Sequence, residues 1–165
     1  MAPFARGACV DTERNSTYGL SMQNWDEYID YYLMQLATGM APEDAFFSLI
    51  EIPSRHVCRL VEAFKQNANW RIDSRKHLLE IIIEHRSVEA IPLLQELLFA
   101  KEPELWKVAL DGLARIGSED VISFLSRAEA EIRRRGDTER SSWVAEVVQD
   151  LVSPGKHIGP PGDDA

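Results

Sequence analysis

Two stretches of this 165-residue chain repeat one pattern at an offset of 31 residues. The segment 73–94 reads DSRKHLLEIIIEHRSVEAIPLL, and the segment 104–125 reads ELWKVALDGLARIGSEDVISFL. A period of this length, with two helical patterns per unit, is typical of a solenoid in which stacked helical hairpins bury each other's apolar faces. The aligned pairs are Leu78 with Ala109, Leu79 with Leu110, Ile82 with Leu113, Ile83 with Ala114, Ser87 with Ser118, Ala90 with Val121, Ile91 with Ile122 and Leu94 with Leu125.

Apolar periodicity and cap residues extend this pattern to eight helices, so we expect an all-α fold built as a short solenoid of helical hairpins. An irregular leader is expected over residues 1–23, the helical repeat domain over 24–152, and a disordered tail rich in Pro and Gly over 153–165. The expected helices are Asn24–Ala37, Pro42–Ile52, Ser54–Asn67, Ser74–His85, Val88–Ala100, Pro103–Ile116, Glu119–Arg135 and Thr138–Val152.

Several single residues carry local expectations. Asn24 is placed to cap the first helix, Gly39 to end it, and Asp137 to cap the last one. Gly112 lies inside a helix, where glycine costs about 1 kcal/mol against alanine, so a close helix crossing is its expected compensation. Cys58, one of two cysteines, is interpreted as a small core residue without a disulfide framework.

The charge balance narrows the range of partners. The chain has 27 acidic and 18 basic side chains and a formal net charge of −9. Nucleic-acid binding requires neutralisation of phosphates, so this balance disfavours it. No apolar run is long enough to span a bilayer, and the leader has no apolar signal segment, so we expect a cytoplasmic protein that does not engage membranes.

Acidic residues gather near the amino terminus of the chain. No Lys or Arg occurs between Arg14 and Arg55. A negative field of this kind steers basic partners and raises association rates. The alternative interpretation is an acidic face that only keeps the protein soluble. The acids in this segment are Asp26, Glu27, Asp30, Glu43, Asp44 and Glu51.

The segment 102–132 resembles the short, phycobilin-lyase type of HEAT-like repeat. It has an acid-Pro-acid start, a helix rich in Ala and Leu, a Gly turn, and a second helix with paired apolar residues. The segment 73–98 resembles the same unit, although Ile81 and Glu84 replace the usual small residues. The resemblance implies a HEAT-like fold and says little about activity, because this family includes scaffolds, chromophore lyases, hydroxylases and DNA-repair enzymes.

Enzymatic interpretations find little support among the residues. HEAT-repeat metal hydroxylases place His-Glu dipeptides in successive repeats, and this chain has none. His77, Glu80 and Glu84 share one helical face with ligand-like spacing, but a solvated polar face explains them without a metal. We therefore expect no catalytic residues, no metal and no cofactor.

Two functions remain open. The first is a non-catalytic protein that binds a basic protein, with an immunity protein or inhibitor of a basic toxin as the most specific hypothesis. The second is a chromophore or cofactor lyase subunit, which requires a deep apolar pocket with convergent polar groups. The candidate contact residues come from three places. Tyr31 and Met34 share the polar arc of the first helix with its acids, and Trp70 lies in a turn. The second helices of the repeats supply the other candidates. The candidate partner-binding residues are Asp26, Glu27, Asp30, Tyr31, Met34, Arg59, Glu62, Trp70, Glu89, Gln95, Glu96, Asp120, Ser123 and Glu131.

Overall fold

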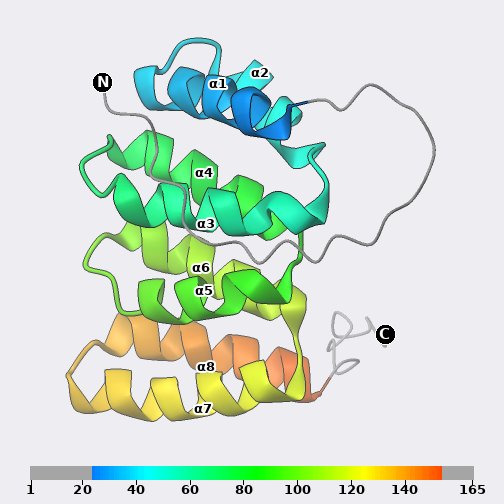
Figure 1. Cartoon of the computed structure of the whole chain (residues 1–165). Helices are drawn as coiled ribbons and strands as arrows, with labels where there is room; N and C mark the ends of the chain where they lie inside the picture. The colour runs from blue at the N-terminus through cyan, green and yellow to red at the C-terminus, as the bar shows by residue number, and fades with distance from the viewer. Residues whose placement is uncertain (1–23, 154–165) are drawn as a thin grey trace, which may run out of the picture. The chain divides into compact units, whose positions relative to one another are not determined.

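Eight α-helices and two short 3₁₀ helices account for the regular structure of residues 24–153, the part of the chain that the computed structural model describes (Figure 1). That range contains no strand, so the all-α prediction is confirmed. The expected leader over 1–23 and nearly all of the expected tail lie outside the described residues. The elements are α1 (Trp25–Thr38), α2 (Pro42–Ile50), η1 (Ser54–His56), α3 (Val57–Gln66), α4 (Ile72–Glu84), η2 (Val88–Ala90), α5 (Ile91–Leu97), α6 (Pro103–Ile116), α7 (Glu119–Arg134) and α8 (Thr138–Val152).

The helices belong to two compact units, and the division falls inside α6, after Gly112. In the first unit, α2 packs against both α1 and α4, and α3 packs against α4 and η2. The ring nitrogen Nε2 of His85 lies 3.0 Å from the carbonyl oxygen of Leu49, which joins the end of α4 to the last turn of α2. The guanidinium of Arg75 on α4 lies 4.8 Å above the ring of Phe64 on α3. In the second unit, α7 and α8 form an antiparallel pair.

The 31-residue offset recurs in the backbone. Helices α4 and α6 begin at Ile72 and Pro103, and the helical segments that follow begin at Val88 and Glu119. Each follower is preceded by an aligned serine whose hydroxyl accepts a backbone N–H: Ser87 from Glu89 and Ser118 from Val121. Such capping satisfies a donor that the first helical turn leaves unpaired. Six of the eight aligned pairs also share the same degree of burial, the exceptions being Ile83 with Ala114 and Ser87 with Ser118.

Most local expectations hold, and three do not. Gly39 ends α1 in the left-handed region with φ of 71°, and Asp137 caps α8 by accepting the backbone N–H of Arg140. Asn24 precedes α1 as expected, but its side chain makes no capping hydrogen bond. Cys58 is not a fully buried core residue, because its side chain is only half-buried. Helical spacing in the sequence predicts an apolar stripe on α8 that includes Trp143, Val144 and Val148, but Trp143 is 48% exposed.

Gly112 marks the expected close approach of helices. A Cβ atom at this position would lie 2.7 Å from Cγ1 and 2.8 Å from Cδ1 of Ile83, and 3.1 Å from Cδ1 of Leu94. Real Cβ atoms essentially never lie within 3.0 Å of another heavy atom. The backbone of α6 can therefore lie this close to the side chains of α4 and α5 only because residue 112 has no side chain. The packing explains why a helix tolerates glycine here.

We expect Gly112→Ala to destabilise the protein by about 1 to 3 kcal/mol, because the overpacking exceeds the gain of about 1 kcal/mol in helix propensity. In a chain that already carries Ile83→Ala, the added methyl enters vacated space, so the same change should be neutral or stabilising. Denaturant unfolding of the four proteins in this cycle measures the coupling. A Gly112→Ala variant more stable than the parent would contradict the close approach.

The turns that follow α4 and α6 have the same backbone conformation with different residues. Arg86 has φ of 48° and Gly117, its partner at the 31-residue offset, has φ of 56°. This left-handed region costs a residue with a Cβ atom about 1 to 2 kcal/mol, whereas glycine enters it readily. The first turn therefore contains strain that the second turn avoids.

Exchanging the residue types should reveal this difference. We expect Gly117→Ala to cost about 1 kcal/mol or more. Arg86→Gly should change stability by less than about 0.5 kcal/mol, because relief of strain offsets the greater freedom of glycine in the unfolded chain. Thermal unfolding followed by circular dichroism measures both. Equal losses of stability in the two variants would contradict the proposed difference in backbone strain between the two turns.

Candidate functional site

The acidic face of α1 is joined to α3 by one arginine. The Nη1 atom of Arg59 pairs with Asp26, and its Nη2 atom lies 2.6 Å from Oδ1 of Asp30. Arg59 is 19% exposed, while Asp26 and Asp30 are 53% and 42% exposed. Because the two carboxylates face solvent, screening limits the contribution of each pair to about 1 kcal/mol or less. The structure thus brings together two parts of the predicted surface that are 29 and 33 residues apart in the sequence.

This pairing corrects the interpretation of the amino-terminal charges. The sequence between Arg14 and Arg55 contains no Lys or Arg, but in space the guanidinium of Arg59 neutralises part of the charge on α1. One cation against two carboxylates leaves the cluster negative. Exposed carboxylates at Glu27 on α1 and at Glu43 and Asp44 on α2 add to that charge. The hairpin remains acidic, although less so than its sequence suggests.

A row of half-buried aromatic rings runs along another side of α1. The centroids of Trp25 and Tyr28 are 5.5 Å apart, and those of Tyr28 and Tyr32 are 4.8 Å apart. The row begins at His56, whose ring lies 5.8 Å from that of Trp25, and ends at Tyr31, whose ring lies 5.0 Å from that of Tyr32. The contacts among Trp25 and the three tyrosines are edge-to-face, and such contacts stabilise by about 0.5 to 1.5 kcal/mol each.

Tyr31 and Met34 occupy the solvent side of α1, as the helical spacing of the sequence predicts. They are 52% and 42% exposed. They lie one turn apart on the helix, with Glu27 one turn before Tyr31, so the three side chains form one surface row. This row is the most direct candidate for contact with a partner, because it combines apolar area with adjacent negative charge.

The other predicted contact residues are more scattered. Trp70 is half-buried in the turn between α3 and α4, where its backbone N–H donates to the carbonyl of Asn67 at 3.0 Å, so it is less accessible than expected. Glu62 and Gln95 are half-buried, and Glu89 and Glu96 are exposed, all in the first unit. Asp120 and Ser123 are exposed on α7, and Glu131 is half-buried there.

The sequence predicts that the arginines at 133–135 interact with the carbonyl end of their own helix and with Glu129 and Glu131 one turn back, and the structure pairs the run with these two acids. Arg133 pairs with Glu129, and both Arg134 and Arg135 pair with Glu131. The hydrogen bond from Arg135, followed by the charge of Arg134, holds the pKa of the Glu131 carboxyl below its usual value. These contacts lie within two turns of one helix, so they support the helix end and leave little reason to assign the run to an anion site.

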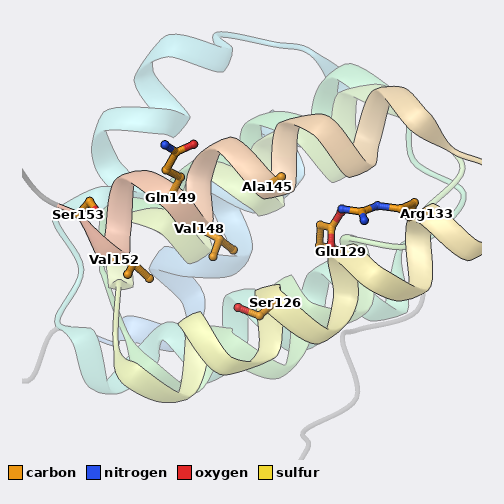
Figure 2. A pocket seen from close by; sticks show the side chains of 8 residues that line it. All are labelled: Ser126, Glu129, Arg133, Ala145, Val148, Gln149, Val152 and Ser153. Carbon is orange, nitrogen blue, oxygen red and sulfur yellow. The ribbon is translucent and has the colours of Figure 1, made fainter. Parts of the chain in front are cut away.

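A groove between α7 and α8 was not predicted. It has a volume of about 400 Å³ and opens to solvent. Figure 2 shows Ala145, Val148 and Val152 of α8 along one side and Ser126 and Glu129 of α7 along the other. The lining is more apolar than polar. The signal was present in the sequence, because residues 145, 148 and 152 recur at helical spacing, but we assigned Val148 to the core stripe of α8.

At the polar end of this groove, the side chains make hydrogen bonds and an ion pair with one another. The hydroxyl of Ser141, which is 6% exposed, donates to Oε1 of Glu129 at 2.9 Å, and Arg133 pairs with the same oxygen. A carboxylate engaged in this way holds α7 to α8.

Residues 24–153 contain no group of three or more acidic, His or Cys side chains that could hold a metal ion. On α4, Glu80 lies 3.6 Å from the ammonium of Lys76. In the same range no helix is long and apolar enough to cross a bilayer. Comparison of the chain with models of protein families, with curated proteins and with solved structures gives no match.

We expect Ser141→Ala to destabilise the protein by about 1 to 2 kcal/mol, because it removes a buried hydrogen bond to a charged acceptor. The neighbouring Ser142 is a matched control, since its exposed hydroxyl donates only to Thr138 in its own helix. Ser142→Ala should change stability by less than about 0.5 kcal/mol. Urea unfolding measures both. Equal effects would show that the contact between Ser141 and Glu129 does not hold the pair together.

Proposed function

We propose that this chain is a non-catalytic, HEAT-like repeat protein that binds a basic protein. One observation carries the proposal: α1 displays Tyr31 and Met34 to solvent beside the carboxylates of Asp26, Glu27 and Asp30. Exposed apolar side chains ringed by charge are typical of protein-binding surfaces. The most specific form of the proposal is an immunity protein or inhibitor that neutralises a basic toxin.

The repeat supports the solenoid part of the proposal. Helix starts, serine caps and left-handed turns recur at the same 31-residue offset. Equivalent backbone geometry at equivalent positions is expected where one supersecondary unit is duplicated and stacked. Proteins of this design use their exposed helix faces for binding, which agrees with a non-catalytic role.

Electrostatics supports the choice of a basic protein over nucleic acid or an anionic membrane. The net charge is −9, and the arginine run on α7 is engaged by Glu129 and Glu131. A surface of this sign repels phosphates and attracts cationic proteins. Arg59 makes the first helix more rigid without removing its negative charge.

A chromophore or cofactor lyase subunit is the second candidate, and the α7–α8 groove is the observation that favours it. Its volume of about 400 Å³ is within the range of small-molecule sites. The groove is open to solvent, however, and its half-buried carboxylate, Glu129, is already engaged by Ser141 and Arg133. A coloured small molecule that copurifies in stoichiometric amount would favour this candidate.

Reversal of the α1 charges tests the primary proposal. The variant Asp26→Lys, Glu27→Lys and Asp30→Lys should recover about tenfold less of its basic partner in affinity purification followed by mass spectrometry, because steering by opposite charge is lost. The control is Glu104→Lys, Glu146→Lys and Asp150→Lys, three exposed acids on α6 and α8 whose reversal changes the net charge equally. Circular dichroism establishes that both variants fold.

The two variants give distinct outcomes. Retention of the partner by the control and its loss by the α1 variant support the proposed surface. Equal loss in both means that net charge alone governs recovery, and equal retention means that the acids of α1 do not contribute. Either of these two results contradicts the proposal.

A further inference from the structure

Four exposed positions on α1 have the spacing of a coiled-coil seam. They are Glu27, Tyr31, Met34 and Thr38, which follow one another at intervals of four, three and four residues. All four are exposed, whereas Ile29, Leu33 and Leu36 form the buried side of the same helix. Alternating intervals of three and four keep side chains on one side of a helix and present them to a second helix lying alongside. We name these four residues the α1 seam.

The composition of the α1 seam restricts what can pack on it. Tyr31 and Met34 supply apolar area at its centre, and Glu27 and Thr38 are polar at its two ends. Tyrosine and methionine are enriched at the buried centres of interfaces, and polar residues at the rims. The solvent-facing side of α1 therefore resembles a small interface, with an apolar centre between polar ends.

The charges next to the α1 seam determine which sign of charge its partner needs. Asp26 and Asp30 lie beside Glu27 on α1, and that helix contains no Lys or Arg. Arg59 pairs with Asp26 and Asp30 and approaches α1 from α3, while Glu27 lies on the solvent side. A cationic side chain that approaches from solvent therefore meets Glu27 first, and the incompletely neutralised aspartates add to the attraction.

We propose that the α1 seam binds an amphipathic α-helix of the basic partner, with Leu-type side chains against Tyr31 and Met34 and a Lys or Arg near Glu27. This rests on the proposed function and adds the shape and chemistry of the segment that binds. A second copy of the chain fits less well, because it would bring another acidic helix against the acids of α1.

A designed peptide tests the seam directly. The probe is a helical peptide of about three heptads with Leu at the seam positions and Lys at the flanking positions, and its counterpart has Glu in place of Lys. Isothermal titration calorimetry near 0.15 M salt should detect binding of the Lys peptide and none of the Glu peptide. The double variant Tyr31→Ser, Met34→Ser should weaken binding at least tenfold, because it removes the apolar centre. Glu27→Gln should weaken it less and reduce its dependence on salt.

Phe47→Ser is the matched control. Phe47 on α2 is 61% exposed and lies outside the seam. Its replacement should leave the affinity within about twofold. An equal loss in the Phe47 variant and the double variant means that the peptide binds any exposed apolar side chain, and this overturns the proposal. Binding of both peptides with equal affinity also overturns it.

Two further measurements separate this inference from the proposed function. Light scattering of the protein alone reports self-association, and a dimer that the Tyr31→Ser, Met34→Ser variant abolishes would assign the seam to a second copy. Affinity purification with that variant is the other measurement. If the partner is retained there but lost on charge reversal of α1, the seam is wrong and the proposed function stands. If neither change affects recovery, both are wrong.

Discussion

The close approach of α6 to α4 and α5 at Gly112 is the constraint on which the repeats depend. The missing side chain lets the α6 backbone rest on Ile83 and Leu94, and these two residues belong to the preceding repeat. Because protein interiors are densely packed, this close approach leaves no room for a side chain at residue 112 and restricts how α6 can lie against α4 and α5. The 31-residue offset also recurs in the aligned serines that precede two helical segments and in the left-handed residues of the turns before them. One close approach of helices within the first unit and one recurring local turn geometry therefore characterise the repeated segment.

The sequence predicts the elements of this fold well because their signals are local. Apolar periodicity identified all eight helices, and the bounds of α6 and α8 agree residue for residue with those expected. The differences between the expected and the observed helices lie mainly at the helix ends. Val88–Ala90 and Ser54–His56 form 3₁₀ turns where we expected the first turn of an α-helix, and α4 begins two residues early. These choices depend on small differences in hydrogen-bond geometry within a single turn, which tertiary contacts decide.

The candidate site is harder to predict, because charges that are distant in the sequence can lie side by side in the folded chain. The acidic segment near the amino terminus lacks Lys and Arg, yet Arg59 reaches it from α3, about thirty residues further along the chain. A helical-wheel projection placed Tyr31 and Met34 correctly on the outer side of α1, because that question concerns one helix. It misplaced Trp143, because burial of a borderline position on α8 depends on how far α7 covers it. Contacts between elements, such as the one from Ser141 to Glu129, have no local signal at all.

Arg59 gives the acids and the apolar residues of α1 different roles in binding. By pairing with Asp26 and Asp30, it holds α1 on α3 and reduces the charge that a partner meets at close range. Partly neutralised, solvent-exposed carboxylates act mainly during encounter, where the summed field of the hairpin matters more than any single pair. Once the partner has docked, desolvated apolar contacts determine how slowly it leaves, since affinity differences within one interface arise mostly in dissociation. If the chain binds a basic protein as proposed, the acids select that partner and speed its arrival, and Tyr31 and Met34 determine how long it stays bound.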